Sequence, residues 1–287
     1  MGMTELLSGH VTNLASQIGP RNLESYEALE AAASYVELSF RAGGLPVTRH
    51  GYEARGRNVD NIEAVIPGTS RKEEIVVLGA HYDTVAHSPG ANDNGSGVAA
   101  LLVLAQLAAR EHFERTVRFV AFVNEENPYF HSELMGSYRY ARMCRAQQDR
   151  IVAMVSLETI GYYSSRPGSQ KYAFPLNLIY PSTADFIAFV SNWRHRSLTK
   201  KLATAFRAHS QFPSQHLAAP EFIPGIGSSD HWSFWQFQYP AAMITDTTNL
   251  RYPHFHAPSD TAEQLDYPRY SEVVEGLRGM LRDVANG

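Results

Sequence analysis

The segment EIVVLGAHYDTVAHSPGANDNGSGVAALLVLAQLAAR, residues 74–110, joins two apolar runs through a loop of small and polar residues. The first run is short and β-branched, which predicts a buried strand over residues 74–83. The second run is rich in Ala and Leu and apolar nearly all round, which predicts a buried helix over residues 96–110. A buried strand followed by a buried helix favours a parallel sheet covered by helices.

The same alternation of strands and helices continues along the chain. Further strands are predicted over residues 58–68, 116–126, 151–163 and 239–247, with a strand or extended segment over 174–181. Further helices are predicted over residues 22–44, 135–146, 185–209 (broken near Arg196) and 267–287. Because no repeat or linker-like composition interrupts this pattern, residues 1–287 are predicted to form a single α/β domain. Its central sheet should be twisted, mixed and mostly parallel, with helices on both faces.

Composition excludes several classes of protein. The 287 residues are 44% hydrophobic and 19% charged, as in ordinary globular proteins. A net charge of -4 offers no basic face for nucleic acid, and no apolar run reaches the roughly 18 residues of a membrane span. The first 20 residues lack the pattern of a signal peptide, so a cytoplasmic location is expected, or a secreted one if a leader has been removed. Cys144 is the one cysteine, which excludes an internal disulfide and a Cys-rich zinc module.

Histidines and acids follow several predicted strands at the point where each strand ends. They are His81, Glu125 and Glu126, Glu158, and, after the last predicted strand, His254 and His256. The carboxyl ends of parallel strands meet at one edge of a sheet, where ligands bind. A charged group at the end of a buried strand is costly unless it is paired or bound to a metal. With a single cysteine in the chain, His, Asp and Glu would have to hold any such metal.

Each of these residues also has an ordinary structural interpretation. The Glu125-Glu126 pair could be a solvated turn, His81 a core histidine, and Asp93 the N-cap of the helix that follows it. Their joint position at successive strand ends favours a site over coincidence. The tetrapeptide SSDH at residues 228–231 does not indicate a serine hydrolase, because neighbours along a helix do not converge and no G-x-S-x-G elbow is present. H-E-x-x-H is also absent.

Six motifs together carry a resemblance to a known family. They are GAHYDT (79–84), GANDNGSGVAALL (90–102), VNEEN (123–127), SLETIGYY (156–163), SSDHWSFWQFQYPAAM (228–243) and FHAPSDT (255–261). In this order they resemble the M28 family of zinc peptidases, over roughly residues 58 to 285. The resemblance implies a zinc exopeptidase-like fold with two co-catalytic zinc ions, or other divalent ions such as Co²⁺ or Mn²⁺.

The resemblance also implies a role for each motif residue. His81 and Glu158 would hold one zinc, Glu126 and His256 the other, and Asp93 would bridge both, while Glu125 would be the general base and Asp83 would orient the site. A cis peptide is implied between Asp93 and Asn94. The implied reaction is hydrolysis of N-terminal residues from peptides with a free N-terminus, through a metal-bridged water activated by the glutamate base.

Two positions depart from the family pattern. Glu158 stands where many aminopeptidases of the family have aspartate, which leaves the geometry at that zinc open. Gly227 stands where some relatives have a tyrosine that stabilises the oxyanion, and Tyr252 or a backbone N–H could replace it.

Other functions on this scaffold remain open at this stage. Glutaminyl cyclases resemble the family but use one zinc, at the equivalents of Asp93, Glu126 and His256, so the presence of His81 and Glu158 favours the peptidase. A carboxypeptidase would need a basic clamp such as Arg251. Candidates for an apolar specificity pocket are Tyr129, Phe130, Tyr162, Tyr163, Phe222, Ile226 and Phe255. Residues 194–226 could form a lid insertion, and the oligomeric state is open.

Overall fold

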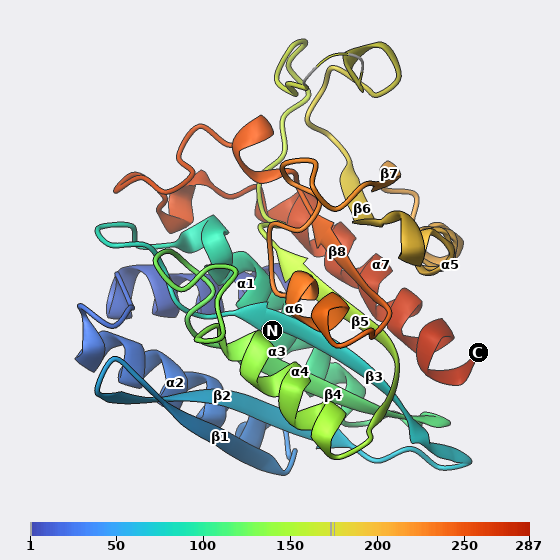
Figure 1. Cartoon of the computed structure of the whole chain (residues 1–287). Helices are drawn as coiled ribbons and strands as arrows, with labels where there is room; N and C mark the ends of the chain where they lie inside the picture. Colours follow the sequence, from blue (N-terminus) through green and yellow to red (C-terminus); the bar gives the residue numbers. More distant parts are fainter. Residues whose placement is uncertain (1, 173, 175) are drawn as a thin grey trace.

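The computed structural model describes residues 2–172, 174 and 176–287, in which eight strands form one sheet (Figure 1). The strands are β1 (Val47–Ala54), β2 (Arg57–Ile66), β3 (Arg71–His81), β4 (Arg115–Phe122), β5 (Arg150–Glu158), β6 (Ile187–Asn192), β7 (Ser214–Ala219) and β8 (Ala241–Thr245). Their order across the sheet is β1-β2-β4-β3-β5-β8-β6-β7. Neighbours in this order are often far apart in the sequence, so helical crossovers connect them.

The described residues also form seven α-helices and several shorter helical turns; α1 and α2 precede β1, and α7 follows β8. The α-helices are α1 (Met3–Thr12), α2 (Tyr26–Ala42), α3 (Gly97–Ala108), α4 (Gly136–Ala146), α5 (Arg196–His209), α6 (His231–Gln236) and α7 (Tyr267–Asn286). The short turns are η1 (Asn13–Ile18), η2 (Ala91–Ser96), η3 (Leu176–Leu178), η4 (Trp193–His195), η5 (Thr248–Leu250) and η6 (Ala262–Gln264).

The middle of the sheet is parallel and its borders are mixed. Strands β4, β3, β5 and β8 pair in parallel, whereas β1 and β2 form an antiparallel hairpin at one edge. At the other edge β6 is antiparallel to β8 and parallel to β7. The prediction of a mixed α/β sheet covered by helices is confirmed. Its parallel centre matters for function, because the carboxyl ends of four strands meet at the same edge.

Helices cover both faces of the sheet and create two cores. Helices α1, α2, α3, α5 and α7 pack on one face, while α4 and α6 lie on the other, in front of the sheet in Figure 1. Strand β3 serves both cores: Val76 and Leu78 face the first, and Ile75 and Val77 face the second. Burial on both sides explains why this strand is a continuous apolar run and does not alternate with polar residues.

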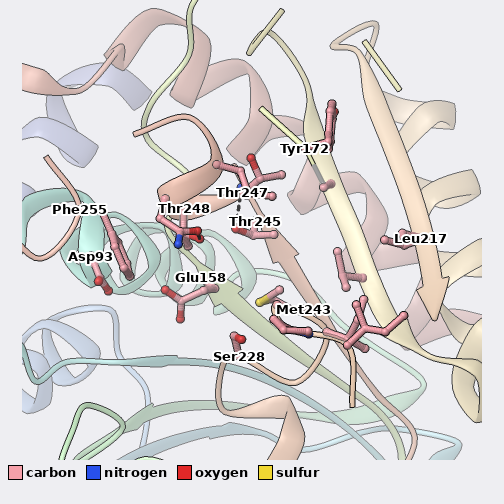
Figure 2. Close-up of a pocket in the computed structure, with 18 of the residues that line it drawn as sticks. Asp93, Glu158, Tyr172, Leu217, Ser228, Met243, Thr245, Thr247, Thr248 and Phe255 are labelled. Carbon is pink, nitrogen blue, oxygen red and sulfur yellow. Dashed lines mark hydrogen bonds between the residues drawn. The ribbon is translucent and has the colours of Figure 1, made fainter. Parts of the chain in front are cut away.

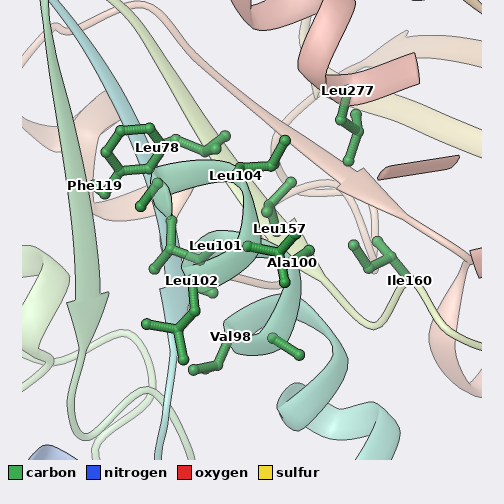
Figure 3. Close-up of a cluster of buried hydrophobic side chains, with 14 of the residues drawn as sticks. Leu78, Val98, Ala100, Leu101, Leu102, Leu104, Phe119, Leu157, Ile160 and Leu277 are labelled. Atoms are coloured by element: carbon green, nitrogen blue, oxygen red, sulfur yellow. The ribbon is translucent and has the colours of Figure 1, made fainter. Parts of the chain in front are cut away.

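Helix α3 lies at the centre of the larger core. Figure 3 shows Leu101 and Leu104 of α3 among Leu78 of β3, Phe119 of β4 and Leu157 of β5. Helix α7 closes the other side of α3 through residues such as Leu277 (Figure 3). Helix α3 has packing partners on all sides, which explains why its sequence is apolar nearly all round. Each fully buried leucine contributes about 1.5–3 kcal/mol to folding, so this helix is a principal source of stability.

Two predicted elements were wrong. Residues 187–192, predicted as part of a long helix, form strand β6, and the α-helix of this range is limited to Arg196–His209, after the short turn η4. Strand β6 is buried throughout, and a short apolar run of this kind has no periodicity that separates a strand from a helix. The strand or extended segment predicted over residues 174–181 is absent among the described residues of that range, which contain the turn η3; residue 175 lies outside the described residues.

Three elements had no sequence prediction. They are helix α1, strand β1 and strand β7. β1 and β7 are the two edge strands, and many of their side chains are partly exposed, so neither has the strong apolar pattern of the central strands. Strand β7 and helix α5 both fall within residues 194–226. No described helix is both long and apolar enough to cross a lipid bilayer.

Candidate metal centre

The parallel strands bring the predicted site residues to one edge of the sheet. β3 ends on His81, and β5, its neighbour, ends on Glu158. Glu125 and Glu126 follow the end of β4 on the other side of β3. Asp93 lies in the turn η2 that begins the crossover helix, and is buried.

His81 forms a first group of metal donors with Asp93 and Glu158. The His81 Nε2 atom lies 3.4 Å from Asp93 Oδ1 and 3.3 Å from Glu158 Oε2. On the other side of the ring, Nδ1 lies 3.2 Å from the backbone oxygen of Asp83, which can only accept a hydrogen bond. The Nδ1 atom therefore carries a proton whether or not Nε2 does, and Nε2 faces the two carboxylates as a metal ligand would. Ligand atoms of these three residues all lie within 4.8 Å of one another.

His256 forms a second group with Asp93 and Glu126. Its Nε2 atom lies 3.0 Å from Asp93 Oδ2 and 3.2 Å from Glu126 Oε1. Asp93 thus turns one oxygen to each histidine, the arrangement of a carboxylate that bridges two ions. The His81 side chain is 1% exposed and that of His256 is 34% exposed, so the second group is the more open of the two.

Glu125 belongs to neither donor group. Its Oε2 atom lies 3.8 Å from His81 Nε2, and the residue lines the cavity that opens at the site. Asp83 holds this segment in place: its Oδ1 accepts the backbone N–H of Glu125 at 3.0 Å, and its Oδ2 accepts that of Glu126 at 3.1 Å. One buried carboxylate therefore sets the positions of both glutamates relative to His81.

The loop that carries Asp93 is held by a residue that sequence reasoning missed. Asp260 accepts the N–H groups of Asn92, at 2.8 Å, and of Asp93, at 3.1 Å. The peptide between Asp93 and Asn94 is cis, as the resemblance implied. Tyr252 donates its hydroxyl hydrogen to Asp260 Oδ1 at 2.6 Å. This hydrogen bond occupies the hydroxyl that the sequence offered as a donor to the oxyanion. Asp260 is the acid of the FHAPSDT motif, so the signal was present but had no assigned role.

A buried arginine from the amino-terminal region also supports the site. Arg21, 0% exposed, donates to the backbone oxygens of Tyr82 at 2.6 Å, Pro89 at 2.6 Å and Gly90 at 2.9 Å. Its pKa is lowered to about 10 by burial, an effect that nearby acids including Asp260 oppose, so it is charged at neutral pH. No motif marked Arg21 in the sequence. It ties the amino-terminal segment to the loop between His81 and Asp93.

Crowded acids shift the protonation of the whole cluster. Burial, reinforced by the charge of Asp93, raises the pKa of Glu126 to about 7, and burial raises that of Glu125 well above its usual value. Burial by itself would lower the pKa of His256, but hydrogen bonds to Asp93 and Glu126 raise it to about 10. Protons on the histidines thus supply the positive charge that the acids require. The imidazole and carboxylate donors fit divalent ions such as zinc, which would supply that charge instead.

Ser229 assists Glu158 and does not form a nucleophile-base pair. Its hydroxyl donates to Glu158 Oε2 at 2.8 Å and contacts the Ser156 hydroxyl at 2.7 Å. His231, two residues on, instead directs Nε2 to the backbone oxygen of Ile226 at 2.7 Å. The SSDH segment therefore orients a carboxylate of the site, in agreement with the exclusion of a serine hydrolase.

A cavity of about 460 Å³ opens at the donor groups. Figure 2 shows Asp93 and Glu158 at one end and Leu217 and Tyr172 at the other, with Met243 between them. Three of the seven predicted pocket residues line it, namely Phe130, Ile226 and Phe255. The other four do not: Tyr129 lines a second cavity, Tyr163 belongs to the core, Phe222 is 87% exposed, and Tyr162 is partly buried outside the cavity.

The acidic and basic residues that line this cavity are four acids and two histidines, His216 and His256. Among the described lining residues there is no lysine or arginine. Arg251, the candidate clamp of a carboxypeptidase, is buried and donates to Gln170 Oε1 at 2.8 Å and to the Phe186 backbone oxygen at 2.8 Å. The cavity therefore favours a cationic group near the donors and an apolar group deeper in.

Sequence similarity to known proteins extends over most of the chain. The model of the family described as "Peptidase family M28" matches residues 61–280. The uncharacterised protein YfbL of Escherichia coli K12 is 36% identical over 96% of this chain and 87% of its own length. A probable leucine aminopeptidase 1 of Trichophyton verrucosum is 24% identical over 99% of this chain and 72% of its own length.

Two solved structures with a similar fold come from different enzyme classes. A zinc aminopeptidase from Bacillus subtilis has a TM-score of 0.78 at 16% identity, covering 99% of this chain and 95% of that one. A glutaminyl cyclase from Bacteroides thetaiotaomicron has a TM-score of 0.72 at 17% identity, covering 98% of this chain and 97% of that one. The fold by itself does not separate these two activities.

Proposed function

The chain belongs to peptidase family M28, and from this premise we propose that it is a zinc-dependent aminopeptidase. The observation that carries the proposal is the pair of donor groups that share Asp93, with an unligated glutamate beside them. Two complete groups match a dinuclear centre. A single-metal centre would need only Asp93, Glu126 and His256.

Two zinc ions are proposed as the cofactor, and Co²⁺ or Mn²⁺ would fit the same donors. His81 and Glu158 would hold one ion, Glu126 and His256 the other, and Asp93 would contact both. When bound, zinc lowers the pKa of water and polarises the scissile carbonyl. Three ligand carboxylates carry three negative charges against the four positive charges of two zinc ions, so the donor set nearly balances the metal charge.

Glu125 is proposed as the general base. Its carboxylate lies at the cavity and outside both donor groups, so it is free to take a proton from the attacking water. The same carboxyl group would then deliver this proton to the amine of the leaving peptide. Asp83 would keep the base at its position through the N–H of Glu125. Glu125 would therefore carry out both proton transfers, and no side chain of the protein would act as the nucleophile.

The cavity supports an N-terminal residue as the part of the substrate that is bound. The free α-amine of such a residue would bind near the donor groups, and the apolar walls of the cavity, such as Leu217 and Met243, suit an apolar side chain. A carboxypeptidase would need a lysine or arginine here to bind the terminal carboxylate, and the described lining residues include neither. We also propose that residues 1–287 form a single catalytic domain and that residues 194–226 form a lid over the site. Within that range, part of β7 and the loop of residues 223–226 line the cavity.

The test compares three kinds of substrate on one protein preparation. Leucine p-nitroanilide and its N-acetylated form separate an aminopeptidase from an enzyme that ignores the N-terminus. Peptides that begin with glutamine test the cyclase, which would release ammonia and form pyroglutamate. We expect hydrolysis of the free aminoacyl substrate and at least about 100-fold less of the blocked one, because acetylation removes the free amine that the site is proposed to bind. Equal hydrolysis of both forms, or cyclisation without hydrolysis, would overturn the proposal.

A further inference from the structure

A second cavity lies on the other side of the candidate site. It has a volume of about 240 Å³ and its lining includes Thr84, Asn127 and Tyr129. Asn127 lines both cavities, and it directly follows Glu126. Thr84 directly follows Asp83. The second cavity therefore begins where the first one ends, next to the residues that hold the proposed metals and base.

Two arginines at the tip of the β1–β2 hairpin complete this second cavity. They are Arg55 and Arg57. Strand β2 is antiparallel to β4, with Ile62 opposite Ala121, so the start of β2 lies at the edge of the sheet where β4 ends. The hairpin tip is thus at the same edge as the donor groups.

Both guanidinium groups are positioned by aromatic rings and not by acids. The Arg55 guanidinium lies 5.2 Å from the centre of the Tyr129 ring, and that of Arg57 lies 4.6 Å from the centre of the Tyr26 ring. None of the ion pairs found among the described residues includes either arginine. Glu24 lines the same cavity, so one negative charge faces two positive ones and the cavity keeps an excess of positive charge. A stacked guanidinium still presents its N–H edge to a carboxylate.

We propose that this second cavity binds the leaving part of the substrate and that Arg55 and Arg57 bind a carboxylate there. The inference rests on the proposed aminopeptidase activity and narrows its substrate class to short peptides that carry a carboxylate near the cleaved bond. The N-terminal side chain enters the first cavity, the scissile bond lies at the donor groups, and the remaining one to three residues extend past Asn127 toward the arginines. The carboxylate is the C-terminal group of such a peptide or an acidic side chain.

The experiment measures kcat/KM for matched acids and amides. Leu-Gly, Leu-Gly-Gly and Leu-Gly-Gly-Gly are each assayed with a free and with an amidated C-terminus. Leu-Gly-Glu amide and Leu-Gly-Gln amide test an acidic side chain. For at least one length or side chain, the wild type is expected to prefer the carboxylate roughly tenfold, the effect of one charge-assisted hydrogen bond. The preference should shrink as salt is raised, because both arginines are exposed.

The double variant R55Q/R57Q should reduce this preference to less than about twofold while hydrolysis of leucine p-nitroanilide, which has no carboxylate, stays within about twofold of wild type. R110Q is the matched control, since Arg110 is an exposed arginine that follows α3 at the opposite edge of the sheet; it should keep the full preference. Equal rates on acids and amides with leucine p-nitroanilide hydrolysed would overturn this inference alone, as would a preference that survives in R55Q/R57Q. No hydrolysis of any substrate would overturn the proposed function as well.

Discussion

At the scale of single residues, Asp93 determines the arrangement of the candidate site. Each of its oxygens faces a different histidine, and its backbone N–H is fixed by Asp260. His81 gains its orientation in the same way, through Asp83. The donors therefore do not rely on a metal alone to bring them together. Supporting hydrogen bonds of this kind are what hold metal ligands in position in other proteins.

Glu125→Gln should separate metal binding from catalysis. Glutamine keeps the size of the side chain but cannot accept a proton, so kcat is expected to fall roughly 10²–10⁴-fold, the usual contribution of a general base. Zinc content should not change, because Glu125 is in neither donor group. The variant and the wild type would be compared by steady-state kinetics and by metal analysis. Activity within threefold of wild type would remove Glu125 from the mechanism.

At the scale of elements, the start of α3 against the end of β5 positions Asp93. A methyl group added at Gly97, the first residue of α3, would lie 2.3 Å from Asn94 Oδ1 and 2.5 Å from the backbone oxygen of Leu157. Neither distance is tolerable for a carbon atom. The helix and the strand can approach this closely only because the residue between them is glycine.

Gly97→Ala should therefore destabilise the protein and weaken zinc binding. The clash is expected to lower the free energy of unfolding by about 1–3 kcal/mol, as for other overpacked sites. Gly9→Ala is the matched control: it lies inside α1 with no atom within 4 Å of the added carbon, and should stabilise by about 0.5–1 kcal/mol. Denaturant unfolding measures the free energy of unfolding of both variants. A neutral Gly97→Ala would show that α3 can shift without cost.

The contact between α1 and α2 should make stability depend on pH. His10 in α1 lies with Nδ1 2.7 Å from the Tyr35 hydroxyl of α2, and burial lowers its pKa from 6.5 to about 4. Between pH 6.5 and about 4, the unfolded chain therefore binds a proton at His10 that the folded protein does not bind. This contribution to stability is complete above pH 6.5 and is lost as the pH falls toward 4, with a total of about 3 kcal/mol.

The variant His10→Gln isolates this contribution. Glutamine can still bond to the Tyr35 hydroxyl but does not titrate in this range. The difference in unfolding free energy between wild type and variant should shift by about 2–3 kcal/mol between pH 7 and pH 4.5, with the wild type losing more. A constant difference over this range would mean that His10 is not kept neutral by the fold.

At the scale of the whole molecule, the proposed zinc ions would join segments that are distant in sequence. The donors come from β3, η2, the segments after β4 and at the end of β5, and the loop before α7. A ligand that binds only the folded state stabilises it by mass action, by about 4 kcal/mol at a concentration 1,000 times its Kd. Metal removal should consequently affect the entire fold and not only catalysis.

Chelation should lower the temperature of unfolding, and zinc should restore it. Metal analysis of the untreated protein is expected to find close to two zinc ions per chain. Glu158→Ala removes a donor from the first group alone, so it should reduce this value toward one while the second group keeps its ion. A wild-type value near one, with the unfolding temperature unchanged by Glu158→Ala, would favour a single-metal centre of the cyclase type.

The sequence by itself determined the central strands, the buried helix α3 and the presence of acids and histidines at strand ends, because apolar runs, their lengths and the residues at their ends are local features. The resemblance to family M28 implied the full set of seven site residues, including Asp83 and Asp93. The parallel order of the strands then placed the residues on a common edge.

Only the tertiary structure decided the rest. The sequence of strand β6 also suits a helix, because its residues are buried on all sides, and pairing with β7 and β8 selects the strand. Arg21 and Asp260 hold the site through contacts with residues more than 60 positions away, which no local pattern records. The second cavity likewise exists because the β1–β2 hairpin folds back to the end of β4. Long-range packing, and not local propensity, determines such features.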